Sequence, residues 1–294
     1  MSGGSDTAAG HSGFSHLKPI SLTEEEAKAS LKIDGMLAPV IGEYVPHFRA
    51  RFVQWFDFAH RLNRLGMRVM DDHVSQLNGR EIRDPVSLSL RLMARANHAF
   101  GAAILLAERG LTIEANSISR TLYETGFWLG YLAQAPDDAA RDFITEEMKS
   151  QLGRDKAARE AMAHEPRAVK ELDAQIRQTE KAKAGRSPVP QLSDIAARGG
   201  CRYYYAYYKV LCGVSGHPTL SSTHGYLSEQ GDEGFYGFAF GPDANGIAKA
   251  IRYACHAHWL CIASHTGLLG FLGAVGEREA YLAELNAMML RSKV

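Results

Sequence analysis

The chain has 294 residues, of which 46% are hydrophobic and 22% are charged, proportions typical of a globular protein with a sizeable core. Its 33 basic residues balance its 33 acidic residues, which argues against a protein whose main task is to neutralise a nucleic-acid backbone. The four cysteines include no Cys-x-x-Cys pair, which argues against a zinc ribbon or disulfide framework and favours reduced thiols in a cytoplasmic protein.

The first part of the chain predicts a tail followed by helices. Residues 1–17 are rich in serine and glycine, so we expect a disordered tail, and residues 18–294 then form a single helical domain. Thr23 or Ser21 precedes three glutamates and is a typical helix cap, and apolar residues recur at helical spacing from Arg49 to about Leu77. Asp84 and Pro85 begin the next helix as its cap and first residue.

The stretch from Leu111 to Gln134 predicts the central helix, because it is apolar on nearly every side. Its charged residues are Glu114, Arg120 and Glu124. Arg120 and Glu124 are four residues apart, so they lie on one helix face and can pair. A buried charge without a partner costs several kcal/mol or so. We therefore favour a structural clamp, from Arg120 to Glu124 or to a carboxylate on another helix, and the alternatives are a functional site or an exposed pair.

Beyond the central helix the sequence becomes strongly charged. The segment from Lys149 to Arg186 contains ten Lys or Arg residues and six Asp or Glu residues, and Pro166 interrupts its helical pattern. We interpret residues 149–190 as a solvated helical arm followed by a linker. Contact with RNA or a protein partner is the alternative for this arm.

Residues 214–245 form the most irregular segment, which contains Ser215 and His217. Long loops inside compact domains are uncommon and often functional. Alternating residues from Gly234 to Gly241 predict a small β-hairpin. If the loop folds over the bundle, His217 is the best candidate for proton transfer, with Glu124 orienting it.

The stretch from Tyr253 to Gly276 contains no Asp, Glu, Lys or Arg and is long enough to cross a membrane. Its histidines, glycines and small polar residues favour a buried helix instead, so no membrane association is predicted. His258, Cys261 and His265 share one helix face, a spacing that could hold a metal ion. No second acidic or histidine cluster completes four ligands unless His217 or His224 folds over this helix, so we favour core histidines and predict no metal.

A ribonuclease of the HEPN type would carry an arginine followed, after four to six residues, by a histidine on the same helix. Arg252 with His258 fits this spacing, as do two other pairs, which is about the number that composition gives by chance. Chemically, Arg252 could steady a phosphate while His256 or His258 moves a proton. Arg252 and His256 are therefore candidate ligand-binding residues.

The apolar helices also carry more positive than negative charge. Their basic residues are Arg91, Arg95, Arg120, Lys249 and Arg252. If several of these side chains face one pocket, a carboxylate or phosphate ligand would suit it. The alternative is that the arginines at 91 and 95 form an exposed stripe.

The motif Arg120-Thr-Leu-Tyr-Glu124, followed by His217-Pro-Thr-Leu-Ser-Ser, resembles an uncharacterised all-helical bacterial family classed only as a domain of unknown function. That family carries Arg-x-x-x-Glu on a central helix and later a tyrosine, a serine and His-Pro. Tyr208 and Ser215 stand in those places here, although Ser215 is closer to His217 than that pattern has it. The resemblance spans roughly residues 100–226, implies that Arg120, Glu124 and His217 belong together, and implies no reaction.

Together these features predict an all-α fold, a single bundle of about seven to nine helices with a small β-hairpin insertion. One function class is an enzyme or binding pocket for an anionic small molecule or RNA phosphate, as in a defence-type nuclease. Its predicted catalytic residues are Arg120, Glu124 and His217, and its predicted ligand-binding residues are Tyr208, Ser215, Arg252 and His256. The alternative is a non-catalytic interaction bundle in which Arg120 and Glu124 form a clamp. In either case we expect a homo-oligomer, and the sequence indicates no particular cofactor.

Overall fold

A computed structural model describes residues 22–216, 218–224, 226–229, 235–239, 241–270, 273 and 276–291. These residues are overwhelmingly helical, which confirms the predicted all-α class. The helices are α1 (Glu24–Asp34), α2 (Val40–Arg51), α3 (Val53–Val74), α4 (Pro85–Ala107), α5 (Thr112–Gln134), α6 (Pro136–Ala161), α7 (Pro166–Lys183), α8 (Leu192–Arg198), α9 (Arg202–Leu211), α10 (Leu220–His224), α11 (Ile247–Leu269) and α12 (Glu277–Arg291).

In the described part of the chain the helices outnumber the predicted seven to nine, because several expected segments are divided. The pattern starting at Arg49 belongs to two helices, since Phe52 leaves helical dihedral angles and separates α2 from α3. In the irregular region a π-helix, η3 (Cys212–Gly216), continues α9, and α10 follows. Two caps are confirmed: the Thr23 side chain accepts from the Glu26 backbone N–H, and the Asp84 side chain accepts from the first turn of α4.

Two short strands accompany the helices. Strand β1 (Leu227–Glu229) pairs antiparallel with β2 (Phe235–Phe238), with Leu227 opposite Phe238. This is the segment in which the sequence predicts a hairpin, and the residues that connect the strands lie outside the described residues. The predicted disordered tail, 1–17, also lies outside them.

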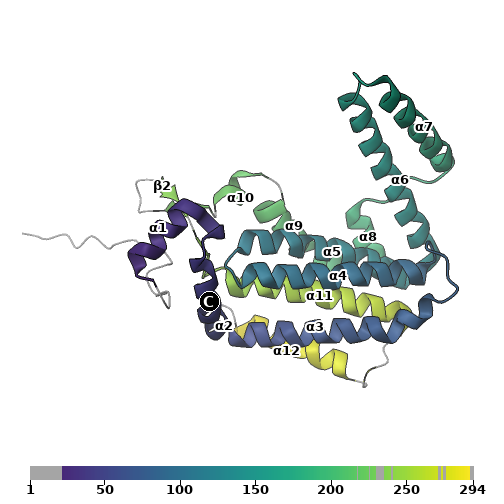
Figure 1. Cartoon of the computed structure of the whole chain (residues 1–294). Coiled ribbons are helices and arrows are strands. Elements are labelled where there is room, and N and C mark those ends of the chain that lie inside the picture. Colours follow the sequence, from purple (N-terminus) through teal and green to yellow (C-terminus); the bar gives the residue numbers. More distant parts are fainter. Residues whose placement is uncertain are drawn as a thin grey trace, which may run out of the picture.

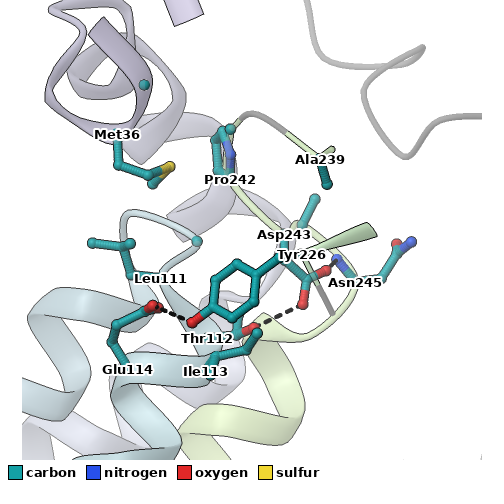
Figure 2. Close-up of a pocket in the computed structure, with 14 residues that line it drawn as sticks. Met36, Leu111, Thr112, Ile113, Glu114, Tyr226, Ala239, Pro242, Asp243 and Asn245 are labelled. Carbon is teal, nitrogen blue, oxygen red and sulfur yellow. Dashed lines mark hydrogen bonds between the residues drawn. The ribbon is translucent and has the colours of Figure 1, made fainter. Parts of the chain in front are cut away.

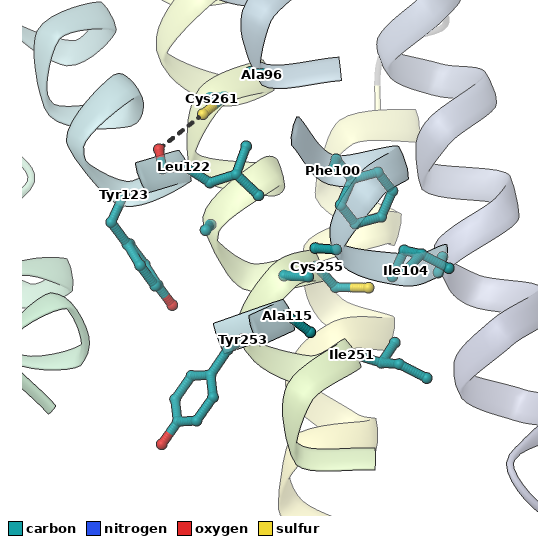
Figure 3. Close-up of a cluster of buried hydrophobic side chains, with 14 of the residues drawn as sticks. Ala96, Phe100, Ile104, Ala115, Leu122, Tyr123, Ile251, Tyr253, Cys255 and Cys261 are labelled. Atoms are coloured by element: carbon teal, nitrogen blue, oxygen red, sulfur yellow. Dashed lines mark hydrogen bonds between the residues drawn. The ribbon is translucent and has the colours of Figure 1, made fainter. Parts of the chain in front are cut away.

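Helix α5 lies at the centre of the bundle, beside α4 and α11, with α8 and α9 on its other side (Figure 1). Every residue from Thr125 to Leu132 is buried, as expected of a helix that is apolar all round. Leu122 of α5, Phe100 of α4 and Cys255 of α11 meet in the cluster shown in Figure 3. The sequence prediction of a central helix at Leu111–Gln134 is therefore confirmed.

Helix α11 contains the apolar stretch that begins at Tyr253, and sixteen of its residues are buried against other helices. Among the described residues, no helix combines the length and the apolar character that crossing a bilayer requires.

Helices α6 and α7 form an antiparallel pair that projects from the bundle (Figure 1). The pair is joined by ion pairs between Lys156 and Glu180 at 2.9 Å and between Arg159 and Asp173 at 2.5 Å. We call α6 and α7 together the arm.

The root of the arm is fixed by a network that connects three helices. The Tyr131 hydroxyl of α5 donates to Asp142 Oδ2 of α6 at 3.1 Å, and Arg198 Nη1 of α8 donates to the same hydroxyl at 2.8 Å. Arg198 also lies 3.6 Å from Asp142 Oδ2. The buried Asp142 carboxylate therefore has both a hydrogen-bond donor and a cation beside it.

Glycines allow α5 to approach its neighbours closely. A Cβ atom at Gly130 would lie 2.6 Å from Cys201 Sγ and 2.8 Å from the carbonyl oxygen of Gly199, before α9. A Cβ atom at Gly199 would in turn lie 2.7 Å from the backbone nitrogen of Tyr131. The two backbones thus meet at a distance that only glycine permits at these positions.

We expect Gly130→Ala to lower the free energy of unfolding by about 1–3 kcal/mol, because the added methyl group collides with backbone atoms that cannot rotate away. Gly101→Ala in α4 is the matched control, since no atom lies within 4 Å of a Cβ there. That variant should raise stability by about 0.5–1 kcal/mol through helix propensity. Urea denaturation of both variants checks the difference, and equal effects would contradict the close-approach argument.

Three histidines of α11 are buried within the bundle. His265 lies 2.8 Å from Ser89 Oγ of α4 through Nδ1 and 3.2 Å from His73 Nδ1 of α3 through Nε2. His258 stacks on Phe100 with ring centroids 4.3 Å apart. Burial lowers the pKa of His258 to about 3, and burial followed by the charge of His73 lowers the pKa of His265 to about 3. Burial followed by the charge of Arg252 lowers the pKa of His256 to about 4.

These histidines should make the fold sensitive to acid. Their folded-state pKa values lie below the unfolded value of about 6.5, so the unfolded chain binds more protons and stability falls as the pH drops from about 6.5 toward 3. Each histidine contributes at most about 1.4 kcal/mol per pH unit. We expect His258→Leu to make the free energy of unfolding less dependent on pH between pH 6 and 4, with the slope smaller by up to about 1.4 kcal/mol per pH unit.

Chemical denaturation at several pH values measures this slope. His98→Gln is the control, since His98 is exposed on α4 and folding leaves its imidazole in water. A slope reduced equally by both substitutions would contradict the assignment to buried His258.

Candidate functional site

The Arg120 side chain joins α5 to α9 and η3. Its Nη2 atom lies 3.0 Å from Glu124 Oε1 and donates a hydrogen bond to the Tyr208 hydroxyl at 3.0 Å, and its Nε donates to Cys212 Sγ at 3.1 Å. The guanidinium also lies 5.0 Å from the centre of the Tyr208 ring. We call these four residues, Arg120, Glu124, Tyr208 and Cys212, the Arg120 cluster.

Tyr208 links the two charged members of the cluster. Its hydroxyl donates to Glu124 Oε1 at 3.0 Å while accepting from Arg120. Burial, a hydrogen bond with Cys212 and the neighbouring Glu124 charge raise the pKa of Tyr208 well above its usual value. The phenol therefore stays protonated, and Glu124 stays the acceptor of its hydrogen bond.

The cluster is only partly covered. The side chains of Arg120 and Glu124 are 20% and 30% exposed. Within the described residues, Arg120 Nη1 and Glu124 Oε2 make no hydrogen bond, so the pair presents a charged donor and a charged acceptor next to each other. This arrangement can bind a ligand that offers both an anionic oxygen and a hydroxyl or amine.

The π-helix η3 holds the backbone against Arg120. The Ser215 hydroxyl donates to the Leu211 carbonyl at 2.8 Å, and Ser117 Oγ of α5 donates to the Ser215 carbonyl at 2.6 Å. A Cβ atom at Gly216 would lie 3.1 Å from both Cδ and Nε of Arg120. Short π-helical turns occur often at functional sites, and this one sets the wall of the cluster.

The structure thus brings together three predicted site residues, Arg120, Glu124 and Tyr208. Ser215 lies beside them, but its hydroxyl is engaged by a backbone carbonyl. The predicted proton-transfer residue, His217, lies outside the described residues.

The other predicted ligand-binding residues, Arg252 and His256, lie in a separate aromatic cluster. His256 Nδ1 lies 2.8 Å from the Tyr123 hydroxyl, and the His256 ring packs against Tyr204 and Tyr207 with centroids 4.8 Å and 4.7 Å away. The Arg252 guanidinium lies 5.5 Å from the Tyr253 ring centre. His256 is 4% exposed, so a ligand would reach Arg252 before it reached this imidazole.

Cys212 was not among the residues that sequence reasoning selected. The sequence does contain a signal for it: Cys212 follows Tyr208 by four residues and so lies on the same face if the helix continues.

The candidate metal ligands of α11 contact different neighbouring helices. The Cys261 thiol donates to the Leu122 carbonyl of α5 at 3.4 Å, whereas His265 faces α3 and α4. Among the described residues, no group of three or more potential ligands could hold a metal ion.

The surface has a cavity of about 400 Å³ at the start of α5 (Figure 2). Its polar lining is acidic: the Tyr226 hydroxyl donates to Glu114 Oε1 at 2.7 Å, and the Thr112 hydroxyl donates to Asp243 Oδ2 at 2.7 Å. Asp243 also accepts from the backbone N–H groups of residues 245 and 246. Its hydrogen-bonding capacity is largely used in holding the start of α11, and the lining contains neither Arg120 nor Glu124.

The fold and the site define an all-helical protein with an Arg-x-x-x-Glu pair on its central helix, bonded to a tyrosine of a later helix. The chain belongs to the family of unknown function DUF5677, whose model matches residues 86–235, and this confirms the resemblance drawn from the sequence. The matched residues include the whole Arg120 cluster. No curated protein and no solved structure matches the chain.

We expect iodoacetamide to modify Cys212 before the other three cysteines in the folded protein. Burial raises the pKa of the Cys201 thiol to about 11 and raises the pKa of the Cys255 and Cys261 thiols still further, whereas Cys212 is partly exposed. Peptide mass spectrometry after brief labelling measures the order, with Cys212→Ser and a denatured sample as controls. Early labelling of Cys255 in the folded protein would contradict the packing of α11.

Proposed function

We propose that the Arg120 cluster binds a phosphate of RNA. The observation that supports this proposal is the partly exposed Arg120–Glu124 pair, in which one guanidinium nitrogen and one carboxylate oxygen make no hydrogen bond to the described part of the chain. Because Glu124 offsets the charge of Arg120, a bare anion gains little at this site. A phosphate next to a hydroxyl gains two hydrogen bonds, and in RNA the 2′-hydroxyl stands next to each phosphodiester.

The same geometry supports cleavage of the RNA strand. Glu124 takes the proton of the 2′-hydroxyl while that oxygen forms a bond to phosphorus and the bond to the 5′-oxygen breaks. Arg120 stabilises the charge that develops on the phosphoryl oxygens. His217, which follows Gly216 in the sequence, is the proposed donor of a proton to the departing 5′-oxygen.

A structural clamp is the second candidate role, and the contacts of Arg120 with α9 and η3 favour it. The two roles differ in what the carboxylate contributes. A clamp uses the charge of Glu124 to hold α9 and η3 against α5, whereas a binding site uses its free oxygen for a ligand.

Glu124→Gln distinguishes the two roles. Under the proposed function we expect unfolding free energy to change by less than about 1 kcal/mol, since the pair is partly exposed and an amide oxygen still accepts from Tyr208. Cleavage of a single-stranded RNA oligonucleotide should fall at least tenfold. Fluorescence anisotropy, gel analysis of the RNA and urea denaturation supply the three measurements.

Glu146→Gln is the matched control, because Glu146 forms a partly exposed ion pair with Lys149 at 3.3 Å on α6, away from the cluster. A DNA oligonucleotide of the same sequence tests the need for the 2′-hydroxyl, and His217→Ala should retain RNA binding while losing cleavage. If Glu124→Gln instead lowers stability by several kcal/mol and the wild-type protein binds no RNA, the clamp is correct and the RNA proposal fails.

A further inference from the structure

A second cavity, of about 630 Å³, lies at the angle between the arm and the bundle. Its walls come from the start of α4 and the residue pair before it, from α6 and from α7. We call this cavity the arm cleft. We propose that the arm cleft binds a mononucleotide-like ligand, a phosphate ester that carries a planar hydrogen-bonding ring.

The cations of the arm cleft support the phosphate part of this ligand. Arg83 and Arg91 both line it. Arg91 Nη1 donates to the carbonyl of Ile82 at 3.4 Å, and among the described residues neither arginine forms an ion pair. The carboxylate of Glu147 also lines the cleft, but it is paired with Arg154 at 2.8 Å on its own helix. Two positive charges therefore remain to attract an anion, and guanidinium groups bind phosphate through paired hydrogen bonds.

The amides of the arm cleft support the ring part. Gln175 and Gln178 of α7 and Gln151 of α6 line the cavity together with Thr179. A primary amide carries both a donor and an acceptor, as the edges of a nucleobase do. Three amides around one cavity can therefore bind a ring that alternates donors and acceptors.

The remaining wall is apolar. Leu88 of α4 is buried, and Phe143, Ile144 and Met148 of α6 lie half-buried beside it. Such side chains pack against the face of a planar ring and exclude water from it. The volume of the cavity lies within the range of about 300–1,000 Å³ that small-molecule sites occupy.

The amides of α7 that line the cleft, Gln175 and Gln178, belong to exposed residues. The residues 175, 178, 179 and 182 are spaced as one helical stripe, and all four line the cleft. A stripe that served only to pack a helical hairpin would carry apolar residues, as the buried Ile176 does on the neighbouring stripe.

Isothermal titration calorimetry of the full chain tests the proposal with AMP, GMP, CMP and UMP, each against its nucleoside and against inorganic phosphate. We expect at least one nucleotide to bind with a Kd below about 1 mM and to bind at least tenfold more tightly than its nucleoside or inorganic phosphate. The double substitution Arg83→Gln with Arg91→Gln should weaken that nucleotide at least tenfold. Gln178→Ala, on the arm surface, should change the preference among the four bases.

Arg95→Gln is the matched control: Arg95 is exposed on α4, one turn beyond Arg91, and does not line the cleft. It should leave the Kd unchanged. The proposal is overturned if no nucleotide binds, if inorganic phosphate binds as tightly as every nucleotide, or if Arg95→Gln has the effect of the double substitution. Glu124→Gln should leave nucleotide binding intact, so failure at this cleft and failure at the Arg120 cluster are separate results.

Discussion

The close packing around α5 constrains the rest of the structure. A helix that is apolar on every side must be surrounded, and α4, α8, α9 and α11 surround this one. Close approach leaves little tolerance for added volume at Gly126 and Gly130. Because α5 packs so closely, its charged side chains lie where its contacts with the neighbouring helices end. Arg120 and Glu124 occupy such a position, where α9 and η3 cover them only in part.

Local chemistry explains why part of the site could be predicted. The Arg120–Glu124 pair follows from spacing and from the scarcity of charge on its helix, and its 3.0 Å contact confirms that inference. Tyr208 entered only through the family resemblance, because nothing in a run of five tyrosines shows which one reaches α5. Cys212 shares the helix face of Tyr208, but its bond to Arg120 depends on η3 lying against α5, and the spacing of residues alone does not show which helices are neighbours.

The same limit applies to α11. Its sequence predicts a buried helix, and the structure agrees, but burial on every side hides which neighbour each histidine meets. His256 faces the tyrosines of α9, whereas His258 and His265 face α3 and α4. The number of helices was wrong for a related reason: the break at Phe52 is a change in backbone direction between two amphipathic segments, and both segments continue the apolar pattern.

The network of Tyr131, Asp142 and Arg198 has a mechanical consequence for α6. This helix has 26 residues and so spans about 39 Å, and four of its five buried residues lie among its first ten. The start of α6 is therefore packed against the bundle, whereas most of the rest of the helix is exposed or partly exposed. A rotation of about 5° at the packed end moves the far tip by about 3 Å, by simple geometry on that helix length. A rotation of α6 about the residues near Asp142 would therefore change the width of the arm cleft, because α6, α7 and the start of α4 line it.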